Sequence, residues 1–242
     1  MPSFANFLLS HGALKIAKSK QEYFKLKSGR LSPVFFNSGT LIGGEALNEV
    51  ANAYADKIAE LIQGKQVEDF GYIFGPAYKG IPLGALACAA LYSRHKISKK
   101  FLYDRKEEKA HGDVKADAVI VGANQFASGG AILMVDDVIT TGGAKFEAWE
   151  KISKTLPNPK LVGILVMVDR QECGGDGKTK AAGAAEEVKK QLGCPLFSIL
   201  AMGELYRAIS PQLPQEAAAA WREYFAEWGS EEAKKWANGQ GA

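Results

Sequence analysis

One stretch of the chain combines residue types that suit sugar-phosphate chemistry. An apolar run, 131–135, ends in the adjacent aspartates Asp136 and Asp137, and the next residues read Val-Ile-Thr-Thr-Gly-Gly. Two neighbouring carboxylates at the end of a buried strand are costly unless hydroxyls, a cation or hydrogen-bond donors meet them. The hydroxyls of a ribose and a hydrated Mg²⁺ are suitable partners. The alternative is a capped strand–helix turn with two solvated aspartates.

The residues after the aspartates predict an anion site. Threonine hydroxyls and glycine amides at the start of a helix form a nest that suits a phosphate monoester. The whole pattern resembles the phosphoribosyl-pyrophosphate (PRPP) signature of the type I phosphoribosyltransferases. The resemblance implies that the aspartates hold the ribose, and that PRPP also contacts Val138, Ile139, Thr140, Thr141, Gly142, Gly143 and Ala144. Gly143 stands where this family usually has Thr or Ser, so a hydroxyl contact worth about 1 kcal/mol is missing.

A basic segment, 104–112, reads Asp-Arg-Lys-Glu-Glu-Lys-Ala-His-Gly. It could be a solvated charged loop in which its two glutamates offset half of the positive charge. It could also close over a pyrophosphate and exclude water. The pattern resembles the catalytic loop of the orotate phosphoribosyltransferases. That resemblance implies PRPP contacts at Arg105, Lys106, Lys109 and His111, and a homodimer in which Lys106 reaches the neighbouring subunit's site.

Two further segments suit the phosphates and the base. Leu-Lys-Ser-Gly-Arg-Leu-Ser-Pro-Val-Phe-Phe-Asn, 26–37, resembles the N-terminal hood segment of the same family, which implies a PRPP contact at Lys27. Phe35 and Phe36 would then offer a stacking wall to a flat pyrimidine, although core packing is the simpler reading of the pair alone. The loop 75–84 resembles the pyrophosphate-binding loop, with Tyr78 and Lys79 as its contacts.

A third segment, Val-Asp-Arg-Gln-Glu at 168–172, follows another apolar run. The guanidinium of Arg170 suits a carboxylate, which it can bind with two parallel hydrogen bonds. Orotate is a uracil that carries a carboxylate. The family resemblance makes Arg170 and Thr140 the orotate contacts, and this feature separates orotate enzymes from purine and uracil enzymes with the same Asp-Asp loop.

The elements around these segments predict an α/β fold. Short apolar runs alternate with helical patterns, which indicates a mainly parallel sheet flanked by helices, with ligands beyond the carboxyl ends of the strands. The expected strands are 72–76, 101–104, 119–122, 131–137 and 161–169, and the expected helices are 44–63, 81–92, 145–154 and 184–192. This arrangement agrees with the type I phosphoribosyltransferase fold that the resemblance implies.

The two ends of the chain lie outside that alternation. Residues 3–18 predict a short helix, or two turns broken at Gly12, and 1–65 would form the N-terminal hood and an amphipathic helix. Residues 66–210 would form the phosphoribosyltransferase core. The segment 211–242 would form a C-terminal extension of one or two helices with exposed aromatic residues, packed over the fold or at a dimer interface.

Composition excludes several other classes of protein. The chain of 242 residues is 47% hydrophobic and carries a net charge of only +3, so neither a nucleic acid nor a membrane surface is expected as partner. The three cysteines are an odd number and form no C-x-x-C pair, which argues against a disulfide scaffold and against a zinc ribbon. The first residues lack the pattern of a signal peptide, and no apolar run is long enough for a membrane span. We therefore expect a cytoplasmic protein.

The resemblance covers almost the whole chain and implies one reaction. It would be a Mg²⁺-dependent pentosyl transfer from PRPP to orotate, giving orotidine 5'-monophosphate and pyrophosphate in UMP biosynthesis. Lys106, Asp136 and Asp137 would be the catalytic residues, acting through charge and orientation. Two alternatives remain: an enzyme of the same fold acting on hypoxanthine, adenine or uracil, and a non-catalytic regulator that senses PRPP and binds nucleic acid.

Overall fold

The structure, a computed structural model, describes residues 3–105, 119–139, 142–175 and 179–240. Among these residues a central sheet of six strands has the order β12-β9-β8-β5-β6-β7. All its neighbours are parallel except β6 and β7. The strands are β5 (Tyr72–Gly75), β6 (Lys100–Asp104), β7 (Ile120–Val121), β8 (Ala131–Ile139), β9 (Lys160–Asp169) and β12 (Leu196–Ala201). The mainly parallel sheet expected from the sequence is confirmed.

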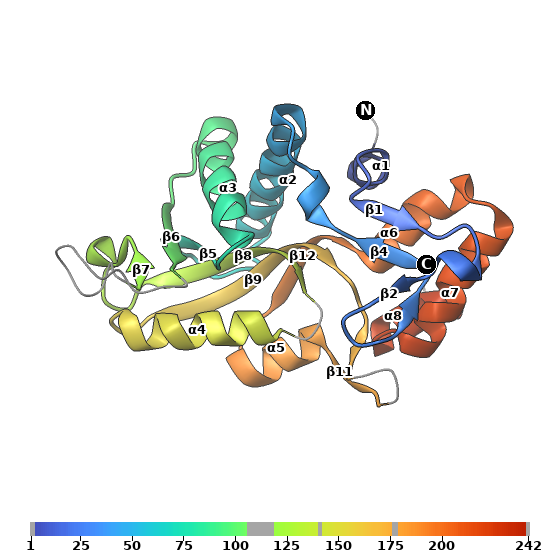
Figure 1. The fold of residues 1–242 in the computed structure, drawn as a ribbon. Helices are drawn as coiled ribbons and strands as arrows, with labels where there is room; N and C mark the ends of the chain where they lie inside the picture. Colours follow the sequence, from blue (N-terminus) through green and yellow to red (C-terminus); the bar gives the residue numbers. More distant parts are fainter. Residues whose placement is uncertain (1–2, 106–118, 140–141, 176–178, 241–242) are drawn as a thin grey trace.

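Helices cover both faces of this sheet (Figure 1). α2 (Gly44–Gln63) and α3 (Gly80–His95) lie on one face, and α4 (Gly143–Thr155) and α5 (Ala184–Leu192) lie on the other. Burial on two faces explains why β9 is almost continuously apolar: its residues 161–168 are all buried. Because the strands are mainly parallel, the strand-to-helix loops gather at the carboxyl ends of the strands, where the predicted site residues are expected.

The N-terminal hood consists of short elements beside the sheet. They are α1 (Phe4–Ser10), β1 (Leu14–Ile16), β2 (Phe24–Lys25), β3 (Leu31–Ser32) and β4 (Val34–Phe36), with 3-10 turns at Lys20–Glu22 and Ser38–Thr40. β1 pairs with β4 and β2 pairs with β3, both antiparallel. Of the two expectations for 3–18, a short helix or two turns broken at Gly12, the structure shows a helix that ends at Ser10 and a break at Gly12. Gly12 takes a positive φ of 67°, which turns the chain into β1.

The C-terminal part contains α6 (Met202–Ile209), a 3-10 turn at Ser210–Gln212, α7 (Gln215–Trp228) and α8 (Glu231–Ala237). The expectation of exposed aromatic residues here was wrong. Trp221 and Phe225 are fully buried and Tyr224 is 7% exposed, because α7 and α8 pack against each other and against the N-terminal elements. Figure 1 shows these helices beside β1 and β4. β12 and α6 were missed by sequence reasoning, since every residue of β12 is partly exposed.

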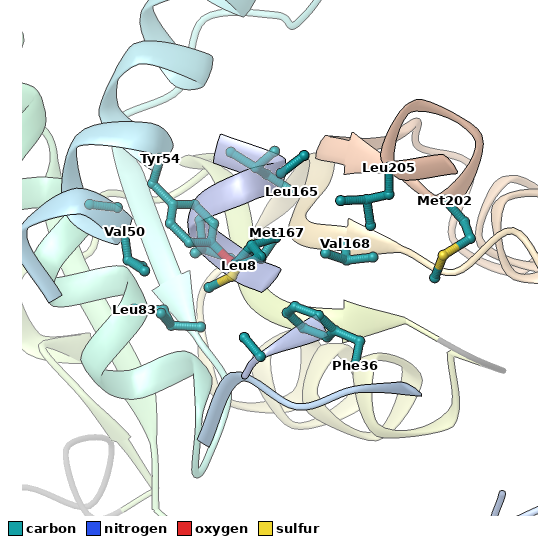
Figure 2. Close-up of a cluster of buried hydrophobic side chains, with 14 of the residues drawn as sticks. Leu8, Phe36, Val50, Tyr54, Leu83, Leu165, Met167, Val168, Met202 and Leu205 are labelled. Atoms are coloured by element: carbon teal, nitrogen blue, oxygen red, sulfur yellow. The ribbon is translucent and has the colours of Figure 1, made fainter. Parts of the chain in front are cut away.

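One cluster of buried side chains joins the three parts of the chain. Figure 2 shows Leu8 of α1, Phe36 of β4, Tyr54 of α2, Met167 of β9 and Leu205 of α6 packed together. A second cluster lies under α4 and α5. The division at residues 65 and 210 stays a prediction, and the shared core shows that the parts pack as neighbours. In the described ranges, no helix is long and apolar enough to cross a membrane.

Candidate functional site

The two aspartates lie near the end of β8, and each is paired with a lysine. Asp136 contacts the ammonium of Lys145 in α4, which also donates to the carbonyl of Val138 at 2.8 Å. Asp137 contacts Lys79 at 2.9 Å and accepts a 2.7 Å hydrogen bond from the Ser38 hydroxyl. Asp136 and Asp137 are 8% and 5% exposed. The strand expected at 131–137 continues for two residues beyond the carboxylates, to Ile139, and sequence analysis named Lys79 as a site residue but did not pair either aspartate with a lysine.

Backbone contacts fix the aspartates further. The Tyr54 hydroxyl donates to the carbonyl of Asp136 at 2.7 Å, and the amides of Asp137 and Val138 donate to the carboxylates of the residues before them. Burial raises the pKa of Asp136, an effect that the Lys145 charge opposes. The pair is therefore rigid before any ligand arrives, as an orienting site requires.

The glycine loop leads from β8 into α4. Gly142 has a φ of 84°, and a side chain there would meet the ring of Phe146, so glycine is required. Gly143 and Ala144 are exposed at the first turn of α4, where backbone amides are free of intrahelical partners. Thr140 and Thr141 lie outside the described residues.

A third buried aspartate holds the loop that carries Tyr78 and Lys79. Asp104, at the end of β6, accepts a 2.6 Å hydrogen bond from the amide of Ala77 and pairs with Lys151 at 3.1 Å. Lys79 and Tyr78 are exposed at the same edge of the sheet. Arg105 follows Asp104 directly and is partly exposed. The predicted residues Lys106, Lys109 and His111 lie outside the described ranges.

A cavity of about 620 Å³ lies between the hood and the sheet. It brings together five of the predicted site residues from the hood, the Lys79 loop and the end of β9. Among the described residues that line it, five are cationic and one is anionic, so it suits an anionic ligand. Its lining comprises Lys25, Leu26, Lys27, Ser28, Arg30, Phe35, Phe36, Asn37, Lys79, Val138, Arg170, Glu172 and Gly175.

The two phenylalanines differ in their surroundings. Phe35 is partly exposed, and its ring stacks on Phe24 with centroids 5.5 Å apart. Phe36 is 5% exposed, and its ring belongs to the core cluster in Figure 2. Alternation along β4 explains the difference, because successive side chains point to opposite faces. A free aromatic face at the cavity is therefore available from Phe35.

Arg170 lies at the base of the cavity in a network that sequence reasoning missed. It is 7% exposed, and its Nη2 donates to Glu172 at 2.5 Å. Arg30 of the hood donates to the other oxygen of Glu172 at 3.1 Å. Arg30 lies in the segment 26–37 and Glu172 in the segment 168–172, both of which the sequence analysis considered. A charged residue among small and apolar neighbours could have indicated a buried ion pair, since charged residues are rarely buried unless they are paired.

Solved structures that are similar to this chain include phosphoribosyltransferases. A crystal structure of an orotate phosphoribosyltransferase from Francisella tularensis matches with a TM-score of 0.76 and 29% identity, over 94% of this chain and 99% of that one. An adenine phosphoribosyltransferase from Saccharomyces cerevisiae matches with a TM-score of 0.53 and 20% identity, over 83% of this chain and 100% of that one. The fold is that of the type I phosphoribosyltransferases.

Curated relatives narrow the class to one family, although no family model matches the chain. A protein from Bifidobacterium adolescentis named orotate phosphoribosyltransferase is 38% identical over 94% of this chain and 96% of its own length. One from Photobacterium profundum with the same name is 37% identical over 93% and 96%. The chain belongs to the orotate phosphoribosyltransferase family.

Proposed function

We propose that this chain transfers the 5-phosphoribosyl group of PRPP to orotate in the cavity between the hood and the sheet, as its family name implies. The products are orotidine 5'-monophosphate and pyrophosphate, on the route to UMP. The single observation that carries the proposal for this chain is that one cationic cavity joins Lys79, Arg170 and the ring of Phe35 beside the Asp136–Asp137 pair. That combination suits a base with a carboxylate and a sugar with phosphates.

The aspartates hold the ribose. Their carboxylates accept hydrogen bonds from sugar hydroxyls and stabilise the positive charge that develops on the ring as pyrophosphate leaves. Asp137 is next to Lys79, so the leaving pyrophosphate and the ribose are held by groups already 2.9 Å apart. One aspartate, which we assign as Asp137, exchanges a proton with the base. The amides of Gly143 and Ala144 bind the 5-phosphate with Thr140, Thr141 and Gly142, and Val138 and Ile139 line the same loop.

The base lies on the other side of the ribose. Arg170 binds the orotate carboxylate, Phe35 stacks on the pyrimidine ring, and the backbone of Phe36 borders it. Thr140 gives the base a further contact. Lys27, Tyr78 and Arg105 bind substrate phosphates. Lys106, Lys109 and His111 complete the pyrophosphate site, with Lys106 acting across the interface of a homodimer.

Mg²⁺ fits this site as a partner of the substrate. Among the described residues, no group of three His, Cys, Asp or Glu side chains is arranged to hold a metal, and both aspartates already face lysines. A metal would therefore be held by pyrophosphate, ribose oxygens and water beside Asp136 and Asp137. When bound, it would neutralise charge on the leaving group. We also place the enzyme in the cytoplasm, where the free thiols of Cys88, Cys173 and Cys194 stay reduced.

The decisive test is a substrate panel. The loss of orotate absorbance is followed with PRPP and Mg²⁺, beside parallel assays with uracil, hypoxanthine and adenine. We expect turnover of orotate alone, and loss of turnover when a chelator removes the metal. Turnover of another base would overturn the base-side proposal. PRPP binding without turnover of any base would support the alternative of a non-catalytic regulator that senses PRPP and binds nucleic acid.

A second test addresses the basic segment. Lys106→Ala is expected to lower kcat far more than it raises KM, because its contact strengthens as charge develops on the leaving group. An unchanged kcat would remove Lys106 from the mechanism.

A further inference from the structure

Glu172 is a buried carboxylate that the mechanism above does not use. It is 4% exposed and bonds two different guanidiniums. Its Oε1 accepts from Arg170 Nη2 at 2.5 Å, and its Oε2 accepts from Arg30 Nη2 at 3.1 Å. Arg30 belongs to the hood, between β2 and β3, whereas Arg170 follows β9. One carboxylate thus connects the hood to the sheet, and all three residues line the cavity.

The Arg170 guanidinium has a buried donor that nothing accepts from among the described residues. Its Nε is buried and has no hydrogen-bond partner among the described residues. A buried donor without an acceptor is unfavourable. A ligand carboxylate that reaches Nε would relieve that cost, provided that the guanidinium is held at the right angle. Glu172 is the only side chain seen to hold it in the part of the chain described.

The C-terminal helices fix the backbone on which Glu172 stands. Gly229 forms an isolated antiparallel bridge with Glu172, and the amide of Ser230 donates to the carbonyl of Gln171 at 2.8 Å. The ring of Trp228 lies 5.2 Å from the Arg30 guanidinium. Trp228, Gly229 and Ser230 follow one another at the end of α7. The C-terminal extension therefore supports the base side of the cavity.

The Gln171 side chain adds to this support. Its Oε1 accepts hydrogen bonds from the amide of Gly203 at 2.9 Å and from Trp236 Nε1 at 3.2 Å. Gln171 itself has a φ of 50°, a conformation that side chains rarely adopt without surrounding restraint. The segment from Arg170 to Glu172 is thus held by α6 and α8 as well as by the end of α7.

We propose that Glu172 is a positioning residue that orients Arg170 toward a base bearing a carboxylate, and that Arg30 sets the charge required for that selectivity. This inference rests on the proposed function. The guanidiniums of Arg30 and Arg170 share the carboxylate of Glu172, so this group of three side chains keeps one unit of positive charge. An anionic base matches that charge, whereas a neutral base such as uracil leaves it buried and unpaired.

Charge and orientation can be separated at Arg30. Arg30→Met removes the excess charge, because Glu172 then neutralises Arg170 alone. Arg30→Lys keeps the positive charge but loses the planar set of donors of the guanidinium. We expect Arg30→Met to lower the preference for orotate over uracil, measured as the ratio of kcat/KM values, by about tenfold or more. Arg30→Lys is expected to retain that preference within about threefold.

Orientation is tested by Glu172→Gln in the full chain. The amide replaces one of the two accepting oxygens by an NH2 donor, so the two guanidiniums can no longer each bond their own oxygen and Arg170 loses its fixed angle. The expected result is a rise in the KM for orotate of about tenfold or more, with the KM for PRPP changed by less than about twofold. Glu150→Gln is the matched control, since Glu150 pairs with Lys154 on the exposed face of α4. It should leave both KM values unchanged.

The outcomes separate this inference from the proposed function. If the wild-type enzyme does not consume orotate, the proposed function is wrong. Wild-type turnover of orotate, together with an unchanged or lower KM for orotate in Glu172→Gln, would overturn the inference alone. Equal changes in both KM values, with a lower melting temperature, would reduce Glu172 to a structural role and also overturn it. Should Glu172→Gln fail to fold, equal base preference in the two Arg30 variants would do the same.

Discussion

The ribose side and the base side of the cavity treat buried charge differently. On the ribose side each carboxylate has its own lysine: Asp136 faces Lys145 and Asp137 faces Lys79. On the base side one carboxylate, Glu172, is shared by two guanidiniums. A balanced pair suits ribose hydroxyls, which are neutral, whereas an excess of positive charge suits a base with a carboxylate. Under the proposed function, this difference would let the aspartate pair and the neighbouring cavity orient two chemically different ends of the ligands.

The largest effect is expected at the lysines of the ribose side. Lys145→Met leaves Asp136 buried without its charge partner, and we expect the free energy of unfolding to fall by about 3–5 kcal/mol. Lys79→Met should cost less than about 1 kcal/mol, because the Lys79 side chain is 53% exposed. Urea unfolding of both variants measures the difference. Equal losses would contradict the distinction between a structural and a ligand-facing lysine.

Removing one carboxylate tests the balance directly. Asp137→Asn keeps the shape of the side chain but removes the charge that faces the ribose, so kcat should fall by about 100-fold. Steady-state kinetics with both substrates saturating gives this value. Asp69→Asn is the control, since the Asp69 side chain is 96% exposed. A kcat within about threefold of wild type would exclude Asp137 from the reaction.

Asp169, which precedes Arg170, tests whether a further carboxylate contributes to the charge on the proposed base side of the cavity. Burial raises its pKa to about 6, against a hydrogen bond from the amide of Gln171. The pKa of Asp169 is higher in the folded than in the unfolded chain, so the folded state binds the proton more tightly. The contribution of Asp169 to the free energy of unfolding is therefore complete below about pH 4 and is lost as the pH rises through 6.

Asp169→Asn should therefore be more stable than wild type at pH 7.5 by about 1–3 kcal/mol, with the gain shrinking toward pH 4. Unfolding measured across that pH range checks the sign. The KM for orotate should not change, because Asp169 does not line the cavity among the described residues. A parallel pair of stability curves would contradict the assignment.

The smallest effect concerns the phosphate loop. A Cβ at Gly143 would meet nothing within 4 Å among the described residues, so Gly143→Thr is the variant with which to restore the hydroxyl. We expect the KM for PRPP to fall by up to about fivefold, equivalent to about 1 kcal/mol, with the KM for orotate unchanged. Gly142→Ala is the contrasting variant, since its φ is 84° and its side chain would meet Phe146 at 2.8 Å. It should weaken PRPP binding; a gain at Gly142 or a loss at Gly143 would refute this reading.

Sequence patterns predicted five of the six strands of the sheet because continuous apolar runs are a local signal. Asp136 and Asp137 were singled out because a continuous apolar run led into two charges. Lys145 was missed although a signal existed, since a lysine in the first turn of a helix opposes the helix dipole and calls for a buried partner. Arg30 and Glu172 are 142 positions apart, so no local pattern could pair them.

The C-terminal helices show the same limit. Trp221 and Phe225 follow a run of alanines that carries no sign of what covers them. Their burial depends on contacts with α8 and the hood, which only the folded chain brings together. Tertiary packing of this kind decides burial more than helical periodicity does.

The most direct test of the two-sided cavity is a crystal structure with orotidine 5'-monophosphate, which carries the base, the ribose and the 5-phosphate in one molecule. The account predicts the base carboxylate about 2.7–3.0 Å from Arg170 and the ribose hydroxyls at Asp136 and Asp137. The phosphate should lie at the first turn of α4. A base bound away from Arg170, or a ribose that does not reach the aspartates, would contradict the account.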